Sequence, residues 1–444
     1  MKKLICVLMA LAMLLTLAAC GGTDASEAGG ENGTEEGTGS GAETQGSGQF
    51  EVGFAKVDIT PDKPVHLASY GDADTRISES VSHPIFVHTV ALRDADGGTV
   101  VILTTDLSWG GGKEAMNDIR PMIEERFGLT KDRVMIGGIH NHNAMDYGYP
   151  DANDQEWMVF YQNCMVESVQ QALDDLAPAR VEIGRTATKN LTFVRRYLLE
   201  NGNYKGDNFN MDDNSPIVSH ESEADEEVQL VRFVREGEHK DIVMVNWQAH
   251  AAKHGHTRSI SADFAGPLRD KVEEATGAWC VFYQGACGNL NPTSRIEGEC
   301  PTGGNGYENA VKHGELVADV VLKALNDGTT MKEINTGRVQ VHQENFITDE
   351  SFDESNTIAC GDLSFVTLPA EFFDCLGKTI KDDTPFEMTV LLGFHCGPGQ
   401  YLPSMEGYMH GGYEVRNTRY TRAGSGERFV EFYLEKLNAL FAER

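Results

Sequence analysis

Short apolar runs of strand length alternate with longer amphipathic segments along most of this 444-residue chain. Strand-like runs occupy 50–61, 83–94, 99–106, 134–139, 229–235, 241–250 and 279–284, and helical periodicity marks 115–127, 155–176, 314–326 and 429–441. A turn at 95–98 joins two of the strand-like runs into a hairpin. The alternation therefore predicts an α/β fold in which helices flank mixed β-sheets.

The first twenty residues have the layout of a bacterial export signal. Lys2 and Lys3 precede an apolar run that ends in small residues and Cys20. This run is shorter than a membrane-spanning helix, and a retained anchor helix is the alternative. The segment 17–20 resembles the lipobox of bacterial lipoproteins, which implies a signal peptide over 1–20 and a lipid on Cys20. We therefore expect an extracytoplasmic protein anchored to the membrane by that lipid.

Composition separates a stalk from a folded part. Residues 21–49 are mostly glycine, serine, threonine and glutamate, so we expect a disordered stalk followed by one large domain over 50–444. The net charge of −31 disfavours nucleic acid as a partner because phosphates would be repelled. The seven cysteines after Cys20 lack metal-site spacing, and single buried thiols are the simplest interpretation.

Two histidines, His140 and His142, stand where the strand-like run 134–139 ends. In an extended chain, side chains two residues apart point the same way, so both imidazoles can face one site. Histidine serves both as a zinc ligand and as a proton shuttle near neutral pH. The pair suggests a metal ligand beside a general base, and a chance pair of surface histidines is the alternative.

Further polar residues follow other predicted strands. His250 ends the apolar run 241–250, and Asp263 lies near a helix start, where it can cap the helix or orient a histidine. Arg195 and Arg196 interrupt an apolar stretch; if buried, they need an anionic partner, and an exposed strand edge is the alternative. The glycine-rich turn at 285–292 can offer backbone N–H groups to an oxyanion, or it can be a plain tight turn.

The ordered series of motifs resembles the catalytic domain of the neutral/alkaline (non-lysosomal) ceramidase family. The series runs through Ile-Thr-Pro, His-x-His, Arg-Arg, Asn-Trp-x-Ala-His, Ser-Ala-Asp-Phe-x-Gly, Gln-Gly-Ala-x-Gly-Asn-x-Asn-Pro, Pro-x-Glu-Phe, Tyr-x-Pro and Gly-Gly-Tyr-Glu. It covers essentially everything after the stalk. The resemblance implies a single ceramidase-like catalytic domain and a zinc-dependent hydrolase of linear amides.

Residue by residue, the resemblance implies a Zn²⁺ ion held by His140, His250, Glu371 and Tyr401. It also implies His142 as the neighbouring base, Arg195 as an active-site cation, and Tyr413 as a hydrogen-bond donor to the substrate. Zinc with two nitrogen ligands, two oxygen ligands and an open position can activate water and polarise a carbonyl. The expected reaction is cleavage of an N-acyl amide, from ceramide to a sphingoid base and a fatty acid.

The chain departs from the family at two points. Asn291 stands where the ceramidases have a serine, so a serine-acyl route is lost while attack by zinc-activated water survives. The immunoglobulin-like C-terminal domain of full-length ceramidases has no counterpart in this sequence, so the substrate can be another lipid amide or small acylated molecule. Two alternatives follow: a related zinc hydrolase acting on another amide or ester of the cell envelope, or a non-catalytic solute-binding lipoprotein.

Overall fold

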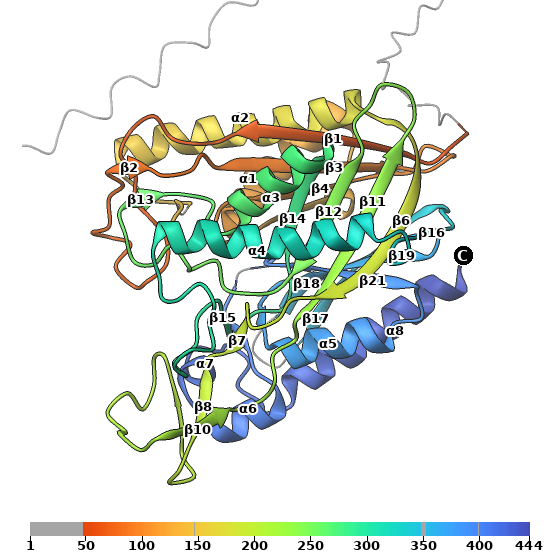
Figure 1. Ribbon diagram of the computed structural model, residues 1–444. Helices are drawn as coiled ribbons and strands as arrows, with labels where there is room; N and C mark the ends of the chain where they lie inside the picture. The colour runs from red at the N-terminus through yellow and green to blue at the C-terminus, as the bar shows by residue number, and fades with distance from the viewer. Residues whose placement is uncertain (1–47, 146, 348–351, 398) are drawn as a thin grey trace, which may run out of the picture. The chain divides into compact units, whose positions relative to one another are not determined.

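Nine strands form the largest sheet of the computed structural model, which describes residues 48–145, 147–347, 352–397 and 399–444 (Figure 1). Along its main path the strands are β14 (Trp279–Gln284), β12 (Ile242–Trp247), β11 (Glu227–Arg235), β6 (Ala177–Ala187), β1 (Glu51–Asp58), β3 (Phe86–Arg93), β4 (Thr99–Thr105) and β5 (Val134–Gly138), with β16 (Lys332–Ile334) paired to β6. The pairs β12/β14 and β4/β5 are parallel, and the other pairs are antiparallel. The predicted mixed sheet is confirmed.

A second sheet of four strands packs against the first. It contains β17 (Val339–Ile347), β18 (Phe352–Cys360), β19 (Leu363–Leu368) and β21 (Met388–Gly393), of which β19 and β21 are parallel. Strand β21 contacts both β14 and β5, although these two strands stand at opposite ends of the large sheet's path. The two ends of the large sheet therefore come close to each other beside β21.

Helices cover the outer faces of both sheets (Figure 1). Helix α2 (Ala152–Asp174) lies along β1 and β3 with α1 (Gly112–Phe127) beside it, and α3 (Ala265–Thr276) and α4 (Tyr307–Asn326) cover the β14 side. Helices α5 (Asp374–Asp383) and α8 (Ser425–Ala442) cover the second sheet. The four predicted helices correspond to α1, α2, α4 and α8, and their ends differ from prediction by a few residues at most positions.

Strand β12 shows why the central strands are nearly all apolar in the sequence. Ile242 and Met244 pack into the core that the two sheets share, whereas Val243, Val245 and Trp247 pack under α3 and α4. Side chains alternate between the two faces of a strand, and here both faces are buried. Asn246 is the polar residue of this strand, and its amide donates to two backbone carbonyls; His250 follows the strand's end.

Short strands and helices complete the fold around the site. The two-stranded pairs are β13 (Ser259–Ile260) with β2 (Ser80–Val81), β15 (Leu290–Asn291) with β7 (Phe193–Val194), and β20 (Glu371–Phe372) with β22 (Tyr401–Leu402). A three-stranded sheet contains β10 (Ile217–His220), β8 (Arg196–Leu199) and β9 (Tyr204–Gly206), and the remaining helices are α6 (Met405–His410), α7 (Tyr413–Arg416) and the 3₁₀ turn η1 (Lys131–Arg133).

The predicted signal peptide, the lipid on Cys20 and almost all of the predicted stalk lie outside the described residues and stay predictions. The seven cysteines within the described part are free thiols, and five of them are buried, as the sequence indicated. No helix among the described residues has the length and apolar character needed to cross a membrane.

Candidate metal centre

Two loops that follow parallel strands bring three imidazoles together. His140 follows β5 and His250 follows β12. The loops meet at a bridge between Asn141 and Ala251, where the His142 N–H donates to the Ala251 carbonyl over 3.0 Å. One ring nitrogen from each of the three histidines lies within 4.8 Å of the other two. The histidines spaced by one residue thus face the same point, and the second loop adds His250 to them.

Backbone strain is concentrated around this point. His140 has a left-handed backbone with φ of +59°, and Ser69, Tyr70 and Gln400 nearby have φ of +67°, +57° and +77°. A residue other than glycine rarely adopts this conformation, which costs roughly 1–3 kcal/mol. Such strain persists only where the surrounding structure imposes it, and it gathers at functional sites.

A two-stranded parallel pair supplies the oxygen side of the site. Glu371 on β20 and Tyr401 on β22 are direct partners in the register. The Oε2 atom of Glu371 lies 3.4 Å from His140 Nε2 and 3.3 Å from His250 Nε2. Both Glu371 and Tyr401 are buried, so the four predicted metal ligands form the floor of one site.

These separations fit a metal ion. Tetrahedral zinc with bonds of about 2.0–2.1 Å sets neighbouring ligand atoms about 3.3–3.4 Å apart. Glu371 Oε2 is buried and accepts no hydrogen bond from any described residue. The Nδ1–H of His250 donates to the Cys287 carbonyl over 2.8 Å, which leaves the Nε2 lone pair facing the centre. The donor set therefore suits zinc.

Electrostatics favour the protonation states that a cation requires. Burial lowers the pKa of His250 to about 4, and the Arg195 charge adds to the effect. Burial, with His140 and His250 nearby, also holds the pKa of His142 well below its usual value. Burial acts to raise the pKa of Glu371, but His140 and His250 outweigh it and hold that pKa below its usual range. At neutral pH the His142 and His250 imidazoles are therefore neutral and the Glu371 carboxylate is ionised, and a metal ligand must be in such a state.

His142 differs from the other two histidines in its surroundings. Its Nε2 lies 3.3 Å from His140 Nε2, close enough to serve the same centre. Yet its Nδ1 has no hydrogen-bond partner among the described residues, whereas His140 Nδ1 lies 3.4 Å from Ser108 Oγ and His250 Nδ1 is held by Cys287. Metal-bound histidines almost always have their second nitrogen held in this way. His142 therefore fits a base facing the cleft better than a ligand.

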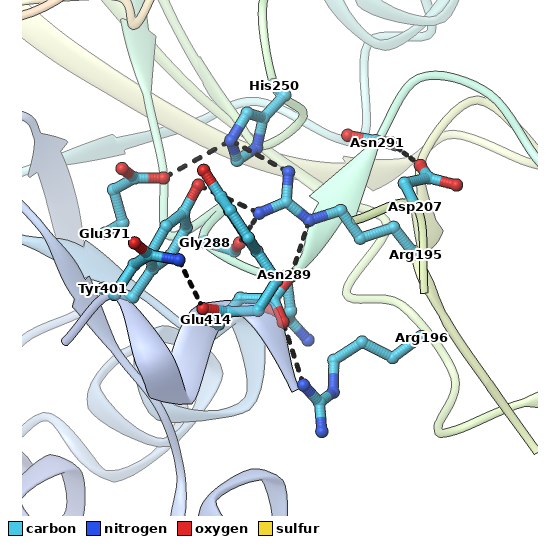
Figure 2. Close-up of polar contacts among 12 residues, drawn as sticks. Arg195, Arg196, Asp207, His250, Gly288, Asn289, Asn291, Glu371, Tyr401 and Glu414 are labelled. Atoms are coloured by element: carbon cyan, nitrogen blue, oxygen red, sulfur yellow. Dashed lines mark hydrogen bonds and ion pairs between the residues drawn. The ribbon is translucent and has the colours of Figure 1, made fainter. Parts of the chain in front are cut away.

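Arg195 contacts both sides of the site (Figure 2). Its guanidinium donates to the Tyr401 hydroxyl over 3.1 Å and to the Gly288 carbonyl over 3.0 Å, and one NH group lies 3.3 Å from His250 Nε2. The buried charge is balanced by Glu414, which accepts from Arg195 Nε over 2.9 Å. The sequence-based expectation of an anionic partner is confirmed, although the sequence did not identify Glu414 as that partner.

The glycine-rich turn before Asn291 acts through its carbonyls. The N–H groups of Gly285, Gly288 and Leu290 donate to backbone carbonyls at 2.8–2.9 Å. The carbonyls of Cys287 and Gly288 instead accept from His250 and Arg195. The contacts favour a structural turn that orients these two side chains and offer no support for its use as an oxyanion site.

A cleft of about 490 Å³ opens over the centre. His140, His142, Glu371, Tyr401 and Tyr413 all line it. Tyr413 begins α7 and its ring centre lies 5.6 Å from that of Tyr401. The remaining wall residues, most of which no sequence motif singled out, are Ser69, Tyr70, Gly71, Trp109, Gln400, Arg416, Asn417 and Thr418.

Four predicted site residues do not line the cleft: Arg195 and His250, which contact the lining residues Tyr401 and Glu371, and Asp263 and Asn291. Asp263 is buried, and its carboxylate accepts the N–H groups of Lys253, His254 and Phe264, so it orders the chain after His250 and the start of α3. Within the described residues, none of the hydrogen bonds to its carboxylate comes from a histidine ring. Asn291 on β15 donates its amide to Asp207 (Figure 2).

A second group of possible ligands, His66, Asp151 and Asp154, has a different character. His66 Nδ1 lies 2.9 Å from Asp154, and its Nε2 lies 3.4 Å from Asp151. Each ring nitrogen therefore already faces a carboxylate, and this arrangement fits a histidine ion pair better than a metal site.

Two solved structures have a fold similar to that of this chain. Neutral ceramidase from Pseudomonas aeruginosa is similar with a TM-score of 0.70 and 14% sequence identity, over 88% of this chain and 75% of that chain. A ceramidase complexed with C2 is similar with a TM-score of 0.73 and 13% identity, over 89% of this chain and 76% of that chain. No protein-family model and no curated protein matches the sequence. The resemblance that the motifs suggested is thus confirmed in the fold, which is that of the neutral ceramidase structures.

Proposed function

We propose that this chain is a zinc-dependent hydrolase that cleaves the C–N bond of a linear N-acyl amide. The observation that carries the proposal is the convergence of His140, His250 and a hydrogen-bond-free oxygen of Glu371 at 3.3–3.4 Å, in a buried site beneath an open cleft. Ceramide is the first substrate to test because the solved structures with this fold are ceramidases. The same floor would also serve another amide or ester of the cell envelope.

His140, His250, Glu371 and Tyr401 would hold the zinc ion. When bound there, zinc would supply a Lewis acid that polarises the substrate carbonyl and makes water a stronger nucleophile. His142 is the candidate proton shuttle because its low pKa keeps it neutral and able to accept a proton. Arg195 and the Tyr413 hydroxyl are the candidate donors to the oxygen that gains negative charge.

The test combines metal content with activity. Purified full-length protein is expected to contain about one zinc per chain and to hydrolyse N-acylsphingosine until a chelator removes the metal. His140→Ala should lose zinc and lose more activity than the 10- to 100-fold that removal of an outer-shell partner costs. His239→Ala is the control because His239 pairs with Asp175 away from the cleft. Unchanged hydrolysis by His140→Ala would refute the metal assignment.

We also propose that the protein is exported and held on the membrane through a lipid on Cys20. The support is the Leu-Ala-Ala-Cys sequence after an apolar run with two N-terminal lysines. Incorporation of labelled fatty acid into the wild type but not into Cys20→Ser is the expected result. Equal labelling of both proteins would rule the proposal out.

A further inference from the structure

The wall of the cleft contains no aliphatic side chain among the residues that the structure describes. The lining consists of aromatic, polar and charged residues with one glycine, and the leucine, isoleucine, valine and methionine side chains lie elsewhere. Two large methionines are exposed nearby in the sequence, Met405 and Met409 of α6, but neither lines the cleft. Each methylene that stays in water forgoes about a fourfold gain in affinity. A long hydrocarbon chain therefore gains little from this surface.

Several polar groups on the wall are free to bind a ligand. The side chains of Ser69 and Gln400 and the hydroxyls of Tyr70 and Tyr413 have no hydrogen-bond partner in the described part of the chain. Ser69, Tyr70 and Gln400, like His140, are held in left-handed backbone conformations. The fold thus holds polar groups in strained positions beside the candidate metal centre, as a site for a polar ligand requires.

Arg416, at the end of α7, adds a positive charge to the rim. Its side chain is exposed and has no hydrogen bond, ion pair or ring contact within the described residues. Arg195 and Arg196, which lie beneath the site, are instead neutralised, because both pair with Glu414. In a chain with a net charge of −31, an unpaired guanidinium beside the cleft is a ready partner for an anionic group.

We propose that the substrate is a small N-acyl amide with a short acyl group and an anionic group, carboxylate or phosphate, on its amine half. This inference rests on the proposed function, and it names a polar molecule, rather than a two-chain lipid, as the substrate. In the reaction the amide C–N bond breaks and the water oxygen bonds to the carbonyl carbon. The nitrogen takes up a proton, so a short carboxylic acid and an anionic amine leave.

Matched substrates test the proposal on the zinc-loaded full-length protein. The carboxylate pair is N-acetylalanine with its neutral amide, and the phosphate pair is N-acetylglucosamine 6-phosphate with N-acetylglucosamine. Micellar N-acylsphingosine is the long-chain comparison. We expect one of the anionic probes to have a kcat/KM at least about tenfold above both its neutral match and N-acylsphingosine. Which pair shows the preference tells whether the anion is a carboxylate or a phosphate.

Arg416→Gln should remove the preference by raising KM about tenfold for the anionic probe, with kcat and the neutral probe unchanged. Arg338→Gln is the control because Arg338 is also exposed, pairs with Asp96 and lies away from the cleft. If Arg416→Gln still cleaves the anionic probe faster than its neutral match, the assignment of Arg416 as the partner of the anionic group would be overturned. Faster cleavage of N-acylsphingosine than of every short probe would overturn the substrate class while the hydrolase proposal stands. Zinc-loaded protein that cleaves none of these amides would instead refute the proposed function, and this inference with it.

Discussion

The side-chain amide of Gln284 holds both histidine-bearing loops. Its Nε2 donates to the carbonyl of Ile139 over 3.0 Å and to that of Ala249 over 2.7 Å, and its Oε1 accepts the Ala249 N–H over 3.2 Å. Ile139 and Ala249 directly precede His140 and His250. Gln284→Leu would remove all three hydrogen bonds with little change in volume, and we expect both imidazoles to lose their positions relative to Glu371.

The structure allows the size of the effect to be worked out. Gln284 is fully buried, so the three backbone groups that it satisfies would be left without partners. Each such loss costs about 0.5–1.5 kcal/mol, or up to about 3 kcal/mol for a group left unsatisfied, which suggests about 2–5 kcal/mol of folding stability in total. Loss of an outer-shell partner weakens metal binding about 10- to 100-fold. We expect the zinc dissociation constant of Gln284→Leu to rise within that range.

Asn246→Leu provides a matched control. The Asn246 amide makes the same pattern of contacts, donating to the carbonyls of Tyr283 and Leu391 over 2.9 and 2.8 Å and accepting the Leu391 N–H over 3.3 Å. Its partners do not directly precede a predicted ligand. Urea unfolding should show comparable losses of stability in the two variants, whereas zinc titration with a competing chelator should show weakened binding only in Gln284→Leu. Equal zinc affinity in both variants would refute the positioning role of Gln284.

Two further predictions concern Asn291 and pH. Asn291→Ser should change kcat/KM by less than about threefold, because the Asn291 amide bonds to Asp207 and the residue does not line the cleft; a gain above tenfold, or a trapped acyl-enzyme, would contradict this. Stability should fall as the pH drops from about 6.5 towards 4, because burial lowers the pKa of His313 to about 3 and that of His395 to about 4. The unfolded chain, with histidine pKa near 6.5, then binds protons that the folded chain does not, at a cost of about 2 kcal/mol for each group at pH 5. Urea unfolding at pH 7.5 and pH 5.0 checks the sign, and equal or greater stability at pH 5.0 would show it to be wrong.

Local patterns were sufficient to predict the elements that carry the site. Buried strands are largely apolar on both faces, so the histidines that follow β5 and β12, His140 and His250, stand out in the sequence. Burial of Arg195 and Arg196 also made an anionic partner predictable as a type of residue, which proved to be Glu414. These expectations depend only on the chemistry of a short segment.

The pairing of distant segments could not be predicted in the same way. Strands β5 and β14 lie at opposite ends of the sheet's path, and only the folded arrangement shows that Gln284 reaches Ile139. In the sequence Gln284 is one more residue before a glycine-rich turn. The polar residues Ser69 and Gln400 likewise have no motif, because their role depends on which loops meet over the metal centre.

Glu414 neutralises the two buried arginines and also positions the helix that carries Tyr413. Its carboxylate bridges Arg195 and Arg196 at 2.9 Å each, and Glu221 pairs with the outer face of Arg196, so two buried cations meet two buried anions. Glu371 is then left unpaired by arginine and available to a metal ion. The same ion pairs anchor α7, on which Glu414 directly follows Tyr413. The network that cancels the Arg195 charge therefore also sets Tyr413 on the cleft wall, where its hydroxyl can face a bound amide.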